Sequence, residues 1–464
     1  MESPREAADT YRLIVTRRNA SEILLLPMGA GWVLPQVEVL PQRRLAEQLT
    51  AEVKRAWGLE TDCLLGPSAR MGDANEEVRC VLMECVQHNG KPPAGAYWMQ
   101  SSVATRCCDS PDAGAISQSL TQIDSCLKSR NAGPFARPGW LRDLLRWAQE
   151  QVAPRGVRLS GRFQQLNASP TFSLLRLETG DGAIWFKATG EPNAHELSVT
   201  LALTQHFPRH LPQILGVRHD WNGWLSAEAA GTPLDEIADI SAWERAAEEL
   251  ATLQIESIQE VNELLENAPL KDLRLPKLAE RIEPFLARMT ELMAAQEKPT
   301  PAPLARSELA TLAQGLKESL ALLGSFALPD SLGHLDFNPG NILASEDHCV
   351  FLDWAEACVT NPLVTFEYLG EHMTRSGAEK PGARERLAAV YLRPWISFCT
   401  PDNLRRALAV APLIAVFAYA TANDSWRSPD LMHDPQRAGY FRSLTRRMYR
   451  EAIQAAQRSE LCLS

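Results

Sequence analysis

The sequence lacks the patterns that mark secreted, zinc-binding and membrane-spanning proteins. Its ten cysteines form no Cys-x-x-Cys pair, and no histidine completes a zinc-ligand spacing with them. The first residues, MESPREAAD, have no basic start followed by an apolar stretch. The longest apolar run, residues 407–422, contains Pro412 and is shorter than the about 20 residues that cross a bilayer. We therefore expect a cytoplasmic protein with reduced thiols and no membrane partner, in which this run is a buried helix.

A surplus of positive charge is also missing, since the formal net charge is −10. This balance argues against a surface built to bind nucleic-acid phosphates. Ten acidic residues against Arg245 alone lie between Asp235 and Glu266. This acidic segment could attract a cationic substrate, but a solvated helix face is the favoured interpretation.

The chain is long enough for two or three domains, each with its own core. Residues 11–26 indicate two strands around a turn at 19–22, and a strand follows at 78–86. Between them, apolar positions every four residues from Leu45 to Trp57 predict a helix that ends at Gly58. The first part therefore mixes sheet and helix.

Residues 109–155 are rich in Ser, Asp, Gly and Pro, with a predicted helix at 140–152, so we place a linker here. Strands resume at 172–177 and 183–188 around the turn 179–182. After Gly231 the pattern is helical, near 241–267, 273–296 and 304–323. The exception is residues 330–355, which predict a loop and two short strands, 341–344 and 349–352. The expected divisions are a domain at 1–130, a linker helix at 131–157, a β-rich lobe at 158–230 and a helical lobe at 231–464.

The exceptional segment carries residues suited to phosphoryl transfer. That reaction needs a carboxylate beside the attacking hydroxyl, oxygen ligands for Mg²⁺ and a cation on the nucleotide phosphates. His334, Asp336 and Asn341 form an H-x-D-x-x-x-x-N loop, and Asp353 follows an apolar strand twelve positions later. The alternative is a loop whose Asp and Asn only cap turns.

The strings HLDFNPGNIL and FLDWAEA resemble the aminoglycoside phosphotransferase family, which includes choline, homoserine and fructosamine kinases. The resemblance covers roughly residues 158–464 and implies an α+β, protein-kinase-like fold with a small β-rich N-lobe and a large helical C-lobe. It implies that Asp336 accepts or orients the proton of the substrate hydroxyl, and that Asn341 and Asp353 hold Mg²⁺. His334 would brace the loop, and the phosphate donor would be ATP or GTP.

The same resemblance assigns nucleotide contacts upstream. Lys187, at the end of AIWFK, looks like the strand lysine that contacts the α and β phosphates, and Glu196 looks like its helix partner. The string WLSAEAAG resembles the hinge that receives the adenine, which places Ser226, Glu228 and Ala230 at the nucleotide.

Three positions depart from the family pattern. The loop 166–172, where relatives approach the phosphates, contains no glycine. Leu335 replaces the common glycine beside the base. Thr365 stands where the family often has an Asp after Asn361 and Pro362, so the catalytic loop is expected to lack one structural partner.

Residues 32–35 and the helix that ends at Gly58 resemble the Nudix box, which would make the first domain an α/β Nudix-like one. Aligned on Gly58 and Leu59, the chain keeps Glu52 but has Arg43, Ala51, Arg55 and Ala56 at other defining positions. One carboxylate cannot hold the cations that such hydrolysis needs. We expect a binding, regulatory or packing module, and the alternative is an ordinary helix end.

Three hypotheses follow. The first is a small-molecule kinase that phosphorylates a hydroxyl of an aminoglycoside, amino-sugar, choline-like or related metabolite. The second is a catalytically weak, nucleotide-binding regulatory protein, and the third, ranked last, is a Nudix pyrophosphatase that depends on Glu52. No nucleic-acid partner is expected, and the sequence indicates neither the acceptor nor an oligomeric state.

Overall fold

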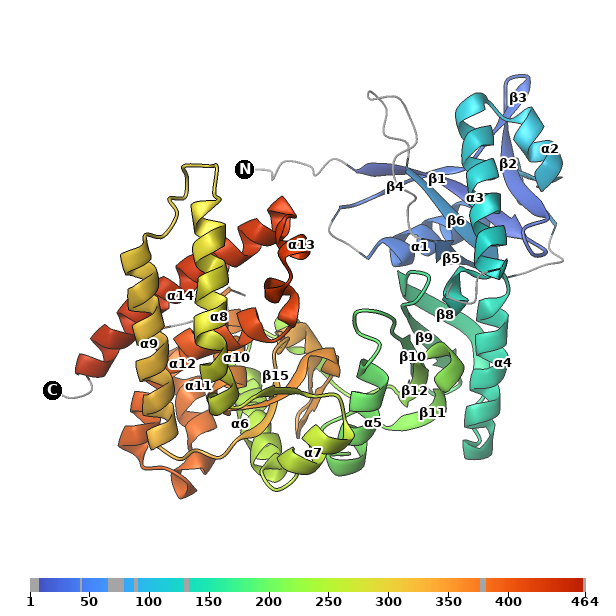
Figure 1. The fold of residues 1–464 in the computed structure, drawn as a ribbon. Helices are drawn as coiled ribbons and strands as arrows, with labels where there is room; N and C mark the ends of the chain where they lie inside the picture. The colour runs from blue at the N-terminus through green and yellow to red at the C-terminus, as the bar shows by residue number, and fades with distance from the viewer. Residues whose placement is uncertain are drawn as a thin grey trace. The chain divides into compact units, whose positions relative to one another are not determined.

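The chain folds into a β-rich unit and a largely helical one (Figure 1). The computed structural model describes residues 8–41, 44–65, 79–86, 91–128, 133–375 and 381–461. The first unit comprises Met1–Leu197 and Gln213–Glu228, and the second comprises Ser198–Pro212 and Ala229–Ser464. Each unit is described by itself below.

The first unit opens with the predicted hairpin, which is confirmed. Strands β1 (Asp9–Arg17) and β2 (Glu22–Met28) are antiparallel. Arg18, Asn19 and Ala20 between them all have positive φ, as a tight turn requires. The strands belong to a sheet in the order β3-β2-β1-β6-β5, in which β4 also pairs with β1 and β7 with β2. These strands are β3 (Gly31–Val33), β4 (Gln36–Val39), β5 (Thr61–Leu65), β6 (Arg79–Cys85) and β7 (Tyr97–Gln100).

Helix α1 (Leu45–Trp57) has the predicted bounds. Leu49 and Val53 are fully buried against the sheet, as their four-residue spacing indicates. Gly58 ends the helix with φ 66°, a left-handed conformation that glycine adopts without steric cost. Arg43, one of the Nudix-box positions, lies outside the described residues.

Two helices that the sequence did not predict follow. Helix α2 (Ser101–Cys107) leads into α3 (Ser110–Lys128), and α3 lies in the region whose composition suggests a linker. Ile116 and Ile123 of α3 are buried. The apolar positions of α3 do recur at helical spacing, but its many Ser, Asp and Gly residues mask the pattern.

The second sheet of this unit has the order β11-β12-β10-β9-β8. Its strands are β8 (Leu159–Ala168), β9 (Ser173–Thr179), β10 (Ala183–Ala188), β11 (Ile214–Arg218) and β12 (Gly223–Ala227). The predicted β9–β10 hairpin is confirmed. The predicted helix α4 (Trp140–Val152) runs beside this sheet (Figure 1). Its buried residues share one hydrophobic cluster with both sheets, from Ile14 on β1 to Leu225 on β12.

The second unit is largely helical, as predicted for the residues after Gly231, and α8, α9, α12 and α14 pack together (Figure 1). Its longer helices are α6 (Ile240–Ser257), α8 (Leu275–Ala294), α9 (Arg306–Ser325), α10 (Leu363–Arg375), α11 (Ala383–Leu392), α12 (Pro401–Thr421) and α14 (Pro435–Leu461). Helix α12 is apolar and long enough to cross a membrane, but 72% of its apolar window is buried inside the protein. It is a core helix, as the sequence indicated.

Six short strands position the loop that carries the candidate chemistry. Strand β15 (Ser331–His334) pairs with β18 (Ala357–Thr360), and β16 (Ile342–Ala344) forms a hairpin with β17 (Cys349–Phe351). The strands predicted at 341–344 and 349–352 are therefore confirmed. Strand β13 (Thr232–Pro233) extends the hairpin, and β14 (Lys271–Leu273) pairs with β18. The short helix α7 (Val261–Asn267) precedes β14.

Candidate functional site

His334 connects the two segments that carry the candidate carboxylates. Its Nδ1 accepts a hydrogen bond from the backbone N–H of Asp336 at 3.1 Å, so its Nε2 carries the proton that is donated to the Leu352 carbonyl at 3.0 Å. The ring is buried, and this burial lowers the pKa of His334. A neutral imidazole thus joins the loop after β15 to the end of β17, next to Asp353.

Asn341 is held by the same two segments. Its side-chain Nδ2 donates to the backbone carbonyl of Asp336 at 3.0 Å, and its own carbonyl accepts from the N–H of Leu352 at 2.8 Å. The amide nitrogen is thereby occupied, which leaves the amide oxygen as the group that could serve a cation.

Asp353 lies where β17 ends, with its side chain exposed. Its φ and ψ are 62° and 61°, a left-handed conformation that is uncommon for residues other than glycine and is tolerated best by Asn and Asp. The next residue, Trp354, is buried and packs its ring 4.8 Å from that of His334. The turn therefore places a carboxylate at the surface beside the His334 contacts.

Two residues at this loop were not recognised as partners from the sequence. Asn338 Nδ2 donates to the Oδ1 of Asp336 at 3.1 Å. Thr365 Oγ1, on α10, accepts from the backbone N–H of His334 at 3.0 Å and is fully buried. The expectation that Thr365 leaves the loop without a partner is wrong, because its hydroxyl supplies one. The sequence marks position 365 by its place after Asn361 and Pro362, but it does not indicate that a threonine hydroxyl accepts this bond.

In the first unit, the structure brings Lys187 and Glu196 together. The Lys187 Nζ, on β10, lies 2.5 Å from Oε1 of Glu196, in the first turn of α5 (Glu196–His206). Both side chains are largely withdrawn from water, with 15% and 2% of their surface exposed. Such a pair interacts more strongly than an exposed one, and it fixes where the ammonium points.

The other residues assigned to the nucleotide lie at the end of β12 and after it. Ser226 is buried and pairs with Trp185 of β10. The Glu228 carboxylate accepts from Arg176 at 2.7 and 3.1 Å, and Arg176 lowers the pKa of Glu228. Ala230 is exposed and belongs to the second unit. The side chain of Glu228 is thus committed to the sheet.

A cavity of about 330 Å³ lies in the second unit beside the loop. Asp336 lines it together with a neighbouring histidine, three tyrosines and two arginines. These residues are His372, Tyr368, Tyr419, Tyr440, Arg375 and Arg447. Glu371, also in the wall, forms ion pairs with Arg447 and, at 3.1 Å, with Arg375. The volume and mixed lining are typical of a small-molecule site.

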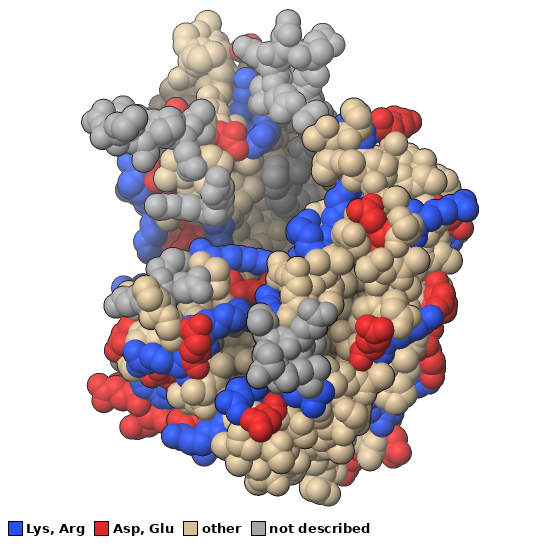
Figure 2. Space-filling view, turned by 90° about the vertical axis from the view of Figure 1, so that its left-hand side faces the viewer, with Lys and Arg blue, Asp and Glu red and all other residues tan. Residues whose placement is uncertain are grey.

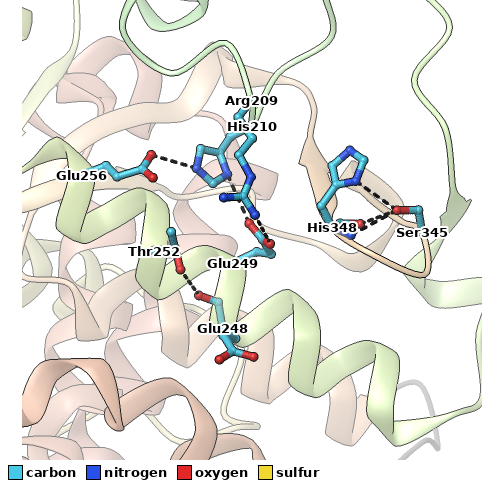
Figure 3. Close-up of polar contacts among 8 residues, drawn as sticks. All are labelled: Arg209, His210, Glu248, Glu249, Thr252, Glu256, Ser345 and His348. Atoms are coloured by element: carbon cyan, nitrogen blue, oxygen red, sulfur yellow. Dashed lines mark hydrogen bonds and ion pairs between the residues drawn. The ribbon is translucent and has the colours of Figure 1, made fainter.

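The acidic segment does not supply this cavity. Glu249 and Glu256 of α6 flank the fully buried ring of His210, at 3.6 and 3.0 Å (Figure 3). Glu249 also pairs with Arg209 at 2.9 Å. Burial lowers the pKa of His210, and the His210 carbonyl accepts from the N–H of Phe351 on β17. These acids are therefore engaged within the protein and anchor the strand that leads to Asp353.

On the face drawn in Figure 2, basic and acidic side chains are interspersed among uncharged ones. Among the described residues, no group of three or more His, Cys, Asp and Glu side chains could hold a metal ion. A structural zinc site of the usual kind therefore has no ligand set in that part of the chain.

The comparison with protein families connects this geometry to a known class. Residues 196–399 match the Phosphotransferase enzyme family. The match includes Glu196, the residues assigned to the hinge, and the whole segment from His334 to Asp353. Lys187 lies outside it. A comparison with curated protein sequences gives no match.

Several solved structures are similar over most of their own length. A choline/ethanolamine kinase family protein from Mesorhizobium loti is 14% identical, with 67% of this chain and 98% of that one covered at a TM-score of 0.40. Plasmodium vivax ethanolamine kinase is 14% identical, with 70% and 93% covered at 0.44. A spectinomycin phosphotransferase in complex with ADP and spectinomycin is 12% identical, with 68% and 98% covered at 0.40.

Proposed function

We propose that the protein transfers the γ-phosphate of ATP or GTP to a hydroxyl of a small molecule. The observation that carries the proposal is the His334 bridge, which ties the backbone of Asp336 to Leu352, next to Asp353, within a segment that matches a phosphotransferase family. Turn-capping alone does not require a buried histidine between these two segments.

In the proposed reaction, Asp336 accepts the proton of the acceptor hydroxyl. The hydroxyl oxygen forms a bond to the γ-phosphorus, the bond from that phosphorus to the β,γ-bridging oxygen breaks, and the nucleoside diphosphate leaves. The hydrogen bond from Asn338 to Oδ1 of Asp336 orients the carboxylate. Lys187, held by Glu196, would contact the α and β phosphates.

The donor set suits Mg²⁺. Asn341 and Asp353 offer an amide oxygen and a carboxylate, which are hard oxygen ligands. Magnesium keeps several waters and binds substrate phosphates, so it needs only one or two protein carboxylates. When bound, it would neutralise charge on the transferred phosphate.

The acceptor would occupy the cavity beside Asp336. Its volume fits a small molecule, and three tyrosines in its wall offer flat apolar surface. The four acids of α6 are all paired within the protein, so they give no support to a requirement for a cationic acceptor. Their partners are Arg209 and His210 for Glu249, His210 for Glu256, Arg386 for Glu244 and Arg393 for Glu248.

For the first sheet and α1 we propose a Nudix-like module without hydrolytic activity. Glu52, the one Nudix-box glutamate retained, forms an ion pair with Arg55 on the same helix. That contact places a cation where a metal would have to bind. A cytoplasmic location is consistent with the nine described cysteines, none of which forms a disulfide.

The test is a screen of hydroxyl-bearing metabolites and aminoglycosides for formation of nucleoside diphosphate from MgATP or MgGTP. With an acceptor in hand, Asp336→Asn should lower kcat by about 10²- to 10⁴-fold. Asp347→Asn, in the exposed turn between β16 and β17, is the matched control and should keep the wild-type rate. Turnover that no acceptor stimulates and that Asp336→Asn does not change would instead favour a nucleotide-binding regulatory protein.

A further inference from the structure

Residues 166–172, the last three residues of β8 and the loop to β9, stand where relatives approach the nucleotide phosphates, yet they include no glycine. Glycine at such a loop lets the backbone come close to phosphate oxygens. In this chain the loop is closed by its own residues, since Ser169 and Phe172 exchange backbone and side-chain hydrogen bonds. The position of this loop therefore depends on its contacts with other elements of the first unit.

Gln165, directly before this loop, is clamped to the first sheet. Its side chain is 1% exposed. The Oε1 accepts from the backbone N–H of Cys63 at 2.7 Å, and the Nε2 donates to the carbonyl of the same residue at 3.1 Å. Cys63 lies at an irregularity in the β5–β6 pairing, where a backbone group is left without its regular partner. One glutamine thus satisfies both backbone groups of a residue in the N-terminal module.

A second contact is made at Pro170, within the loop. The carbonyl of Pro170 accepts from the N–H of Phe135, before α4, at 3.3 Å. Gly133 lies so close that a Cβ added to it would stand 1.8 Å from the same carbonyl oxygen. The φ and ψ of Gly133 are −59° and 156°, which any residue can adopt. This position therefore needs glycine for the close approach of the loop, not for its dihedral angles.

Further contacts complete the support. Ala168 packs against the hydrophobic cluster between the first sheet and α1. Gln164 donates to Glu47 of α1 at 2.6 Å, but both side chains are largely at the surface. The hydrophobic cluster around α4 continues without a break from the first sheet to β9 and β10.

We propose that the N-terminal module positions the phosphate-facing loop of the β-rich lobe, with Gln165 as the principal positioning residue and Gly133 as the site of close contact. In this proposal, contacts from the N-terminal module fix the position of residues 166–172. In glycine-rich loops, the backbone itself provides the close approach to the phosphates. This inference assigns the N-terminal module a role in nucleotide binding, and it rests on the proposed use of a nucleotide.

The test compares Gln165→Met with Gln118→Met in the full-length protein. Gln165→Met keeps the length of the side chain but removes both contacts to Cys63. It should raise the KM for MgATP by about 10- to 100-fold, with a smaller change in kcat. Amide hydrogen exchange within residues 166–172 should accelerate, while exchange in α12 should not change. Gln118→Met, at an exposed position on α3, should alter neither.

Gly133→Ala is a second test of the same inference, at the contact with Pro170, and it can be used if Gln165→Met does not fold. Its added methyl group must displace the loop, so it should also raise the KM for MgATP. Wild-type KM and exchange in either folded variant would overturn the inference. If amide exchange in residues 166–172 is faster in the variants but the protein turns over no nucleotide, the proposed function is wrong. The role of Gln165 in positioning the loop is then still supported.

Discussion

The ring of His334 lies between the backbone of Asp336 and that of Leu352, and it bonds to both. Since Asp353 follows Leu352, this imidazole joins the two carboxylate-bearing segments, in addition to the contacts that Asn341 makes with both. A side chain that only filled the same space would leave a backbone N–H and a carbonyl without these partners.

Replacement of His334 by phenylalanine should lower kcat by about 10- to 100-fold, because small displacements of reacting groups are costly to the rate. The KM for the nucleotide should change less. Steady-state kinetics with a defined acceptor measure both values. His348→Phe, in the turn between β16 and β17, is the control, since the hydrogen bonds of His348 to Ser345 lie within that turn. Equal kinetics for both variants would show that the bridge does not position Asp336.

Thr365→Val should destabilise the second unit by about 1–3 kcal/mol, because the buried N–H of His334 loses its acceptor. Thr365→Ser retains the hydroxyl and should be closer to wild type. Urea denaturation measures the difference. Thr374→Val, at an exposed position on the same helix, should change stability by less than about 0.5 kcal/mol. If Thr365→Val is as stable as Thr365→Ser, the hydroxyl does not support the loop.

Asp62 and Glu84 face each other across β5 and β6, and both are buried. Burial, followed by the charge of Glu84, raises the pKa of Asp62 well above its ordinary value. The folded protein then binds more protons than the unfolded chain above about pH 4, so stability falls as the pH rises through the folded-state pKa. Asp62→Asn should therefore be more stable than wild type at pH 8, by roughly 1–3 kcal/mol.

The difference between Asp62→Asn and wild type should shrink as the pH is lowered to 5. Urea unfolding at several pH values measures it. Asp143→Asn provides the comparison, because Asp143 is at the surface and pairs with Arg146. A stability that depends on pH equally in Asp62→Asn and wild type would contradict the raised pKa of Asp62.

The sequence predicted those parts of the fold whose signals are local. The helix from Leu45 to Trp57 was found because its apolar spacing and Gly58 agree. The turn before β10 and the strands around residues 341–352 were found from turn residues and short apolar runs. Helix α3 was missed because its Ser, Asp and Gly residues weaken the local signal, and packing of Ile116 and Ile123 decides its conformation.

The candidate site could likewise be predicted only where a local motif marks its residues. Asp336, Asn341 and Asp353 could be named because a motif fixes their order and spacing. The contact from Thr365 to His334 joins residues 31 positions apart, and the clamp from Gln165 to Cys63 joins residues 102 apart. The resemblance marks the position of Thr365 but does not indicate its bond to His334, and nothing in the sequence marks Gln165 or Cys63. Only the folded chain determines which distant polar groups meet.

The shared hydrophobic cluster around α4 limits how this chain can be divided. A cut near residue 130 or 157 looks reasonable from composition, but it would expose buried side chains such as Phe135, Leu144 and Phe186. A shortened protein that starts at either point would present that surface to water and to its own copies. Aggregation of such fragments during expression would then result from the interrupted hydrophobic core. It would not show whether the remaining residues are catalytically competent.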